Sequence, residues 1–75
     1  MPSVPIVNGK KLIKVLLKKG FILNRISGSH HILIHPTRKL RVSVPVHQGR
    51  TLGRGITQAI IKDAGFTSEE FIKLL

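Results

Sequence analysis

The sequence holds four histidines, and two of them are neighbours in the short segment Gly28-Ser29-His30-His31. An imidazole with an ordinary pKa, about 6.5, can accept a proton in one side chain and donate a proton from another near neutral pH. Cleavage of an RNA phosphodiester needs both actions, because the 2′-hydroxyl must lose a proton and the departing 5′-oxygen must gain one. This segment is therefore a candidate for acid–base chemistry, although a single histidine is more often structural.

A metal site is a weaker interpretation of these residues. In a strand, His30 and His31 point to opposite faces, and His31 and His35 lie about 13 Å apart at roughly 3.3 Å per residue. Zinc–nitrogen bonds measure only about 2 Å. The acidic residues that would serve a magnesium ion all occur from Asp63 onward. We therefore expect neither a metal ion nor another cofactor.

The elements that must position the histidines follow from caps, turn residues and hydrophobic spacing. The chain predicts a helix between Gly9 and Gly20, strands over residues 21–26, 31–35 and 40–44 with Pro45 ending the third, a helix over 55–64, and a terminal helical turn from Thr67 or Ser68. Apolar residues at helical or alternating spacing are expected in the core: Leu12, Ile13, Leu16, Leu17, Phe21, Leu40, Val42, Val44, Ile56, Ala59, Ile60, Ile61, Phe66, Phe71, Leu74 and Leu75. This order predicts an α+β fold, α–β–β–β–α, with a three-stranded antiparallel sheet.

The pairing of the second and third strands decides which histidine is exposed. If Thr37 and Arg38 are the central residues of the turn, position 33 pairs with 42 and position 31 with 44. His31 then faces the core, and His30 lies on the opposite face with Arg41. A slip of one residue reverses this arrangement, so the sequence leaves both open.

Thirteen Lys and Arg against three Asp and Glu give the chain a formal charge of +10. Such an excess attracts polyanions, which makes nucleic acid the leading partner. An acidic protein would bind the same surface, and a membrane ranks below both because Trp and Tyr are absent. The lack of cysteine excludes disulfides and thiolate sites, and no apolar run is long enough to span a bilayer, so we expect a cytoplasmic protein.

A chain of 75 residues, 41% of them hydrophobic, suits a single domain over 1–75, in which Pro2 and Pro5 keep residues 1–7 extended. Guanidinium groups, ammonium groups and the amides at a helix start all favour phosphates. The candidates for RNA contact are Lys10, Lys11, Lys14, Arg41, Arg50 and Arg54, with Gly53 and Gly55 beside the second helix.

Several short segments occur in a characteristic order along most of the chain. They are Gly9-Lys10-Lys11-Leu12-Ile13-Lys14, Lys19-Gly20-Phe21, Gly28-Ser29-His30, His35-Pro36, Val42-Ser43-Val44-Pro45, His47 and Ile60-Ile61-Lys62-Asp63-Ala64-Gly65-Phe66. Together they resemble the HicA toxins, also called the YcfA-like family, which are small bacterial ribonucleases that act on messenger RNA.

This resemblance implies a fold similar to double-stranded RNA-binding domains, with the helices on one face of the sheet. It also implies a catalytic histidine at His30, in a turn shaped by Gly28 and Ser29, and a HicB-type antitoxin that blocks the site. Because one histidine cannot be acid and base at once, a second group is needed. His47 is the candidate, and water or the RNA itself is the alternative.

We therefore expect the toxin of a type II toxin–antitoxin system, acting as a metal-independent endoribonuclease on mRNA. Two alternatives use the same fold and charge. One is an RNA-binding module without catalysis, and the other is the basic half of a protein complex that has lost activity.

Overall fold

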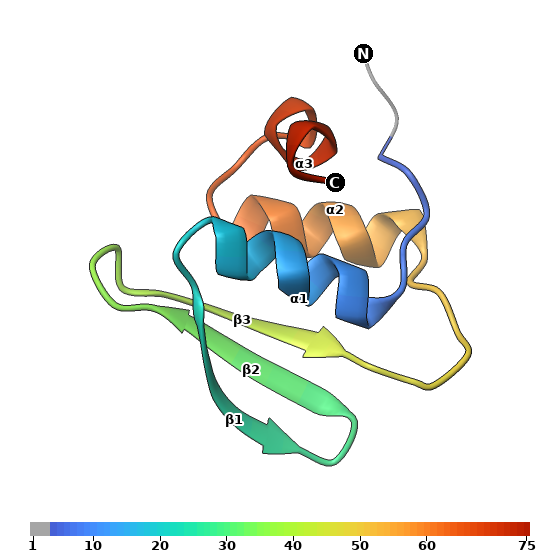
Figure 1. Cartoon of the computed structure of the whole chain (residues 1–75), viewed down its shortest axis with the longest axis horizontal. Helices are drawn as coiled ribbons and strands as arrows, with labels where there is room; N and C mark the ends of the chain where they lie inside the picture. The colour runs from blue at the N-terminus through green and yellow to red at the C-terminus, as the bar shows by residue number, and fades with distance from the viewer. Residues whose placement is uncertain (1–3) are drawn as a thin grey trace.

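The computed structural model describes residues 4–75, so the predicted extension of residues 1–3 lies outside the described part of the chain. The elements are α1 (Gly9–Lys18), β1 (Ile22–Ser27), β2 (His30–His35), β3 (Leu40–Pro45), α2 (Arg54–Asp63) and α3 (Ser68–Leu74). The strands form one antiparallel sheet in the order β1-β2-β3, and the helices lie on one side of it (Figure 1). The predicted α–β–β–β–α order is confirmed, and the terminal turn is a seven-residue helix.

Side-chain caps and glycines set the helix ends, as the sequence predicts. The Asn8 Oδ1 atom accepts a hydrogen bond from the Lys11 amide at 2.8 Å, which begins α1. Gly20 follows α1 with a φ of +96°, a conformation that ends helices at low cost. Thr67 begins α3 in a reciprocal capping box with Glu70.

The core lies between the helices and one face of the sheet. Leu33, Val42 and Val44 of the sheet form one buried cluster with residues of all three helices, among them Leu12, Leu16, Ile60, Ile61 and Phe71. The three phenylalanines are all buried, as predicted. Ile13, Leu40 and Leu74 pack at the margin of this cluster.

Four residues predicted in the core are exposed instead. Leu17 and Ile56 are 47% and 50% exposed, Leu75 at the chain end is 38% exposed, and Ala59 lies on the solvent side of α2. Each helix buries a stripe narrower than its apolar residues suggest. On α2 the buried position next to Ile56 is Thr57, whose hydroxyl donates to the Gly53 carbonyl at 3.0 Å.

The register of β2 and β3 resolves the alternative that the sequence leaves open. Leu33 pairs with Val42 and His31 pairs with Val44, so His31 shares the helix-covered face of the sheet. His30 points to the opposite face, because neighbouring residues of a strand alternate. Pro45 pairs with His30 as the last residue of β3, one residue beyond the predicted end of the strand.

Candidate active site

A tight turn between β1 and β2 fixes the position of His30. Ser27 and His30 are paired, with Gly28 and Ser29 as the two central residues. Gly28 has a φ of +59°, which a type II′ hairpin turn requires at its first central position and which glycine adopts readily. His30 therefore starts the central strand on a rigid two-residue turn.

The imidazole of His30 is exposed on the helix-free face of the sheet. Its Nδ1 atom lies 3.4 Å from Oγ of Ser43 on β3, at the long limit for a hydrogen bond. The sequence places its three acidic residues only at Asp63, Glu69 and Glu70, in α2 and α3. No carboxylate is thus available on the sheet to orient this ring.

The loop after β3 lies directly beside the Gly28–Ser29 turn. The Val46 amide donates a hydrogen bond to the Ser29 carbonyl at 2.7 Å, and Pro45 pairs with His30. His47 follows two residues after Pro45. The two histidines that the sequence singles out are therefore at the same end of the sheet, although sixteen residues lie between them in the chain.

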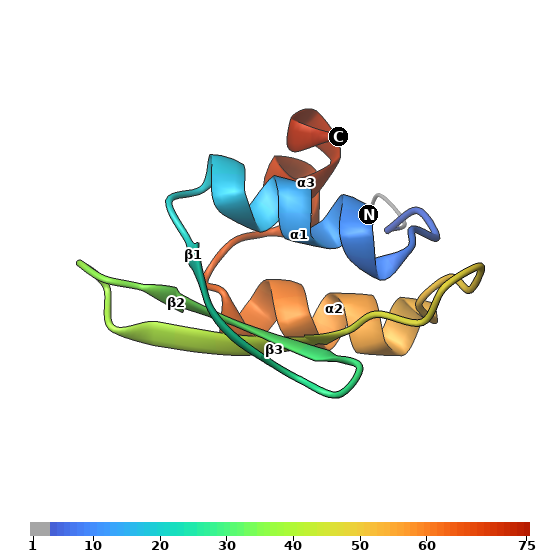
Figure 2. The same ribbon diagram turned by 60° about the horizontal axis from the view of Figure 1, so that its bottom comes forward.

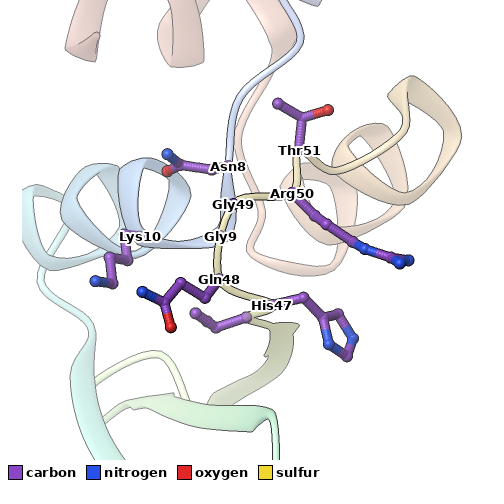
Figure 3. A pocket seen from close by; sticks show the side chains of 9 residues that line it. Asn8, Gly9, Lys10, His47, Gln48, Gly49, Arg50 and Thr51 are labelled. Atoms are coloured by element: carbon purple, nitrogen blue, oxygen red, sulfur yellow. The ribbon is translucent and has the colours of Figure 1, made fainter.

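A second tight turn joins His47 to a cation. The Arg50 amide donates to the His47 carbonyl at 3.1 Å, and Gly49 has a φ of +75°. A positive φ at the third residue is the mark of a type II turn, whose first and fourth residues lie close together. Figure 3 shows the side chains of His47 and Arg50 extending to the same side of this loop.

A pocket of about 290 Å³ lies between this loop and the start of α1 (Figure 3). It is lined by Asn8, Gly9, Lys10, Val46, His47, Gln48, Gly49, Arg50 and Thr51. A Cβ atom on Gly9 would stand 2.6 Å from the Pro45 carbonyl oxygen, so only glycine lets α1 approach β3 this closely. The close approach brings Lys10 to the same pocket as His47 and Arg50, with no acidic residue among the lining.

The other predicted RNA contacts are spread over the surface. Lys11 and Lys14 are exposed on α1, and Arg54 is exposed as the first residue of α2, outside the pocket. Arg41 pairs with Ile34 and lies four residues before Pro45, which is roughly 13 Å along β3 from the His30 end. The β2–β3 turn and the loop after β3 are at opposite ends of the molecule (Figure 2). Arg41 therefore belongs to the other end.

The remaining histidines have structural surroundings. The His35 ring packs edge-on against Phe21, with centroids 5.1 Å apart, and its Nδ1 accepts from the Arg38 amide at 3.2 Å. Its Nε2 must then carry the proton, which it donates to the Lys19 carbonyl at 3.2 Å. The Nδ1 atom of His31 is buried and has no hydrogen-bond partner in the described part of the chain.

Asn8, Gln48 and Thr51 line this pocket, but the sequence does not predict them there. Asn8 is predicted only as a helix cap, and residues 46–53 show no periodic pattern. The one signal in the sequence is Gly49 between polar residues, which is typical of a turn that would return the chain toward the start of α1. In residues 4–75, no group of three His, Cys, Asp or Glu residues is placed to hold a metal ion, and no helix has the length and apolar character needed to cross a bilayer.

Fold and site together define a small, strongly basic α+β fold in which His47, Lys10 and Arg50 line one pocket at the end of a three-stranded sheet. His30 lies at the same end of the sheet but is not part of the pocket lining. A profile of the family described as "HicA toxin of bacterial toxin-antitoxin" matches residues 9–66 of the chain. The protein therefore belongs to the HicA toxin family, which implies a toxin role and an antitoxin partner. No curated protein matches the chain.

Proposed function

We propose that this toxin is an endoribonuclease that cleaves mRNA by histidine acid–base catalysis at the end of the sheet where His30 lies. The observation that supports this most is the exposure of His30 on a helix-free face, at the start of a strand fixed by a tight turn. An RNA strand can approach this face without any rearrangement of the helices. Family membership supports the same conclusion.

The proposed reaction is an internal transfer at one phosphodiester. One imidazole accepts the proton of the 2′-hydroxyl, whose oxygen attacks the phosphorus while the bond to the 5′-oxygen breaks. A second imidazole donates the proton that the departing 5′-oxygen needs. We assign these roles to His30 and His47, because the loop that carries His47 begins beside the turn before His30. The proposed route needs no metal ion.

The neighbouring cations have a separate role in this proposal. Lys10 and Arg50 flank the loop that carries His47, and neither side chain is engaged in an ion pair among the described residues. Cations placed where negative charge develops on the phosphate stabilise the transition state. Arg50 also holds a phosphate through a planar pair of donors, which lysine cannot do.

Cleavage of a defined single-stranded RNA in excess chelator, followed on a denaturing gel, tests this function. The wild-type protein is expected to cut, and His30→Ala is expected to lose cutting by at least about a hundredfold, the usual contribution of a general acid or base. His47→Ala is expected to lose less, because water can replace a proton donor.

His31→Leu is the matched control, since this neighbouring histidine faces the helices and is expected to leave cleavage unchanged. Circular dichroism of each variant checks that the fold is retained. Undiminished cleavage by a folded His30→Ala variant would remove the mechanism. RNA binding by the wild type without any cleavage would instead support the non-catalytic RNA-binding module.

A further inference from the structure

The edge strand β1 is unusually exposed for a strand with so many apolar side chains. All six of its residues are exposed, and Ile22, Leu23 and Ile26 are 49%, 46% and 56% exposed. Among residues 4–75, β1 pairs only with β2, so one row of its backbone N–H and C=O groups has no strand partner there. Three large aliphatic side chains thus border an open row of hydrogen-bonding groups.

A β-bulge places Leu23 and Ile26 on one face of the sheet and Ile22 on the other. Leu23 pairs with Leu33 and Arg25 pairs with Ile32, which leaves Asn24 as the extra residue. Leu23 and Ile26 therefore lie on the helix-side face, opposite Leu33 and His31. Ile22 lies on the other face, opposite Ile34.

The geometry points to strand addition, and we propose that the antitoxin of this system docks by pairing a strand with the open edge of β1. A partner that covered one face of the sheet would bury either Ile22 or the pair Leu23 and Ile26. An added strand carries side chains on both faces, so it covers all three, and its backbone satisfies the open row. β1 begins beside α1 and then runs away from the helices along the outer edge of the sheet, so its second half has no helix beside it (Figure 1).

The charge of this protein indicates which kind of partner binds the open edge of β1. A second copy of this chain would bring two proteins of formal charge +10 edge to edge. RNA gains little from aliphatic side chains, and β1 has no aromatic residue on which bases would stack. A protein with an apolar strand would cover the aliphatic side chains, and acidic residues beside that strand would pair with Arg25. We assign this role to the antitoxin implied by family membership, because a protein that binds a toxin of formal charge +10 gains from acidic residues at the contact.

β1 leads directly to the candidate site, so a partner bound along β1 would reach the end of the sheet that carries His30. β1 runs into the Gly28–Ser29 turn, and its last residue, Ser27, pairs with His30. An antitoxin strand aligned along β1 would therefore extend to the end of the sheet that carries His30. The proposal itself rests on family membership and on this edge, and it does not depend on nuclease activity.

The test measures binding of the purified cognate antitoxin to the double variant Leu23→Thr/Ile26→Thr by isothermal titration calorimetry. Threonine keeps the preference for strands but removes apolar surface. We expect binding at least tenfold weaker than wild type. The control is Ile56→Gln/Ile72→Gln, which removes two aliphatic residues of similar exposure from α2 and α3, and its affinity is expected to stay within twofold.

Hydrogen exchange on the wild-type complex supplies a readout that side-chain contact alone would not change. Strand addition is expected to slow exchange of outward-facing amides within Ile22–Ser27 at least tenfold. Equal affinity of the double variant and its control, or unchanged exchange in β1, would overturn the proposal. Sedimentation showing a dimer of the toxin alone that the double variant abolishes would assign the edge to a second copy and overturn it as well.

Discussion

Two histidines that are adjacent in the chain meet opposite surroundings because a strand alternates its side chains. His30 faces solvent beside Ser43, whereas the Nδ1 atom of its neighbour His31 is buried and has no hydrogen-bond partner among residues 4–75. A buried polar atom that lacks a hydrogen bond destabilises the fold, while an apolar side chain of similar size carries no such penalty. A polar side chain is therefore tolerated at position 30, whereas an apolar side chain suits position 31 better.

This contrast predicts that His31→Leu leaves the protein as stable as wild type or more stable, by up to roughly 1 kcal/mol. Leucine is close to histidine in volume and removes the unpaired nitrogen from the helix-covered face. Urea unfolding followed by circular dichroism measures the change. A loss of stability greater than about 1 kcal/mol would mean that this nitrogen has a partner in solution.

His35→Leu is expected to behave in the opposite way, with a loss of roughly 1–3 kcal/mol. The substitution leaves the Lys19 carbonyl and the Arg38 amide without their ring partners, and it removes the edge-on packing against Phe21. The same urea titration measures it. Stability equal to wild type would show that water replaces both hydrogen bonds.

At the scale of elements, the carboxylate of Glu70 closes the N-terminal cap of α3. The amide of Thr67, the ammonium group of Lys19 and the Thr67 hydroxyl hold the pKa of Glu70 below its ordinary value of 4.5, the Thr67 amide having the largest effect. Because the pKa is lower in the folded state, this group stabilises the fold above its ordinary pKa. That contribution is lost as the pH falls through the folded-state pKa.

Glu70→Gln is therefore expected to flatten the fall in melting temperature on acidification from about pH 6 to about pH 3. Glutamine can keep the reciprocal cap with Thr67 but carries no charge to titrate. Thermal unfolding at several pH values measures the slope. Glu69→Gln, in the same turn but outside the cap, is the control, and an equal slope for wild type and Glu70→Gln would contradict the prediction.

The elements themselves were predictable because their signals are local. Asn8 and Thr67 mark helix starts through their side chains, and Gly20 marks a helix end through its positive φ. The pairing derived from a turn centred on Thr37 and Arg38 is the observed β2–β3 register. The turn itself differs, because it comprises residues 36–39, and the Lys39 amide donates to the His35 carbonyl at 2.9 Å. The bulge at Asn24 was not predictable, because an extra residue in one strand changes no hydrophobic period that a short, exposed strand displays. The face on which Leu23 and Ile26 lie depends on it.

The candidate site was predictable only in part, for a related reason. The turn before His30 is encoded by Gly28, but the link between this turn and the loop after β3 is a hydrogen bond between distant backbone atoms. The approach of α1 to β3 at Gly9 is equally long-range. Residues 46–53 carry no periodic pattern, so the sequence does not indicate that this loop forms a pocket with the start of α1.

At the scale of the whole molecule, the excess of positive charge is unevenly distributed. The acidic residues are confined to the end of α2 and to α3, where Lys19 pairs with Glu70 at 3.2 Å. The exposed face of α1, which carries Lys10, Lys11 and Lys14, has no acidic residue. If this face holds RNA, its lysines should each release counterions on binding.

We therefore predict that Lys10→Ala/Lys11→Ala/Lys14→Ala weakens binding of single-stranded RNA and lowers the slope of log affinity against log salt by up to about 2, at roughly 0.7 for each phosphate that the protein no longer neutralises. Fluorescence anisotropy across a salt series, in the His30→Ala background to prevent cleavage, measures both quantities. The control Lys62→Ala/Lys73→Ala removes charges from α2 and α3, beside the acidic residues, and is expected to change the slope by less than about 0.7. Equal effects of the two sets would show that RNA responds to net charge alone, and that α1 is not the surface that holds it.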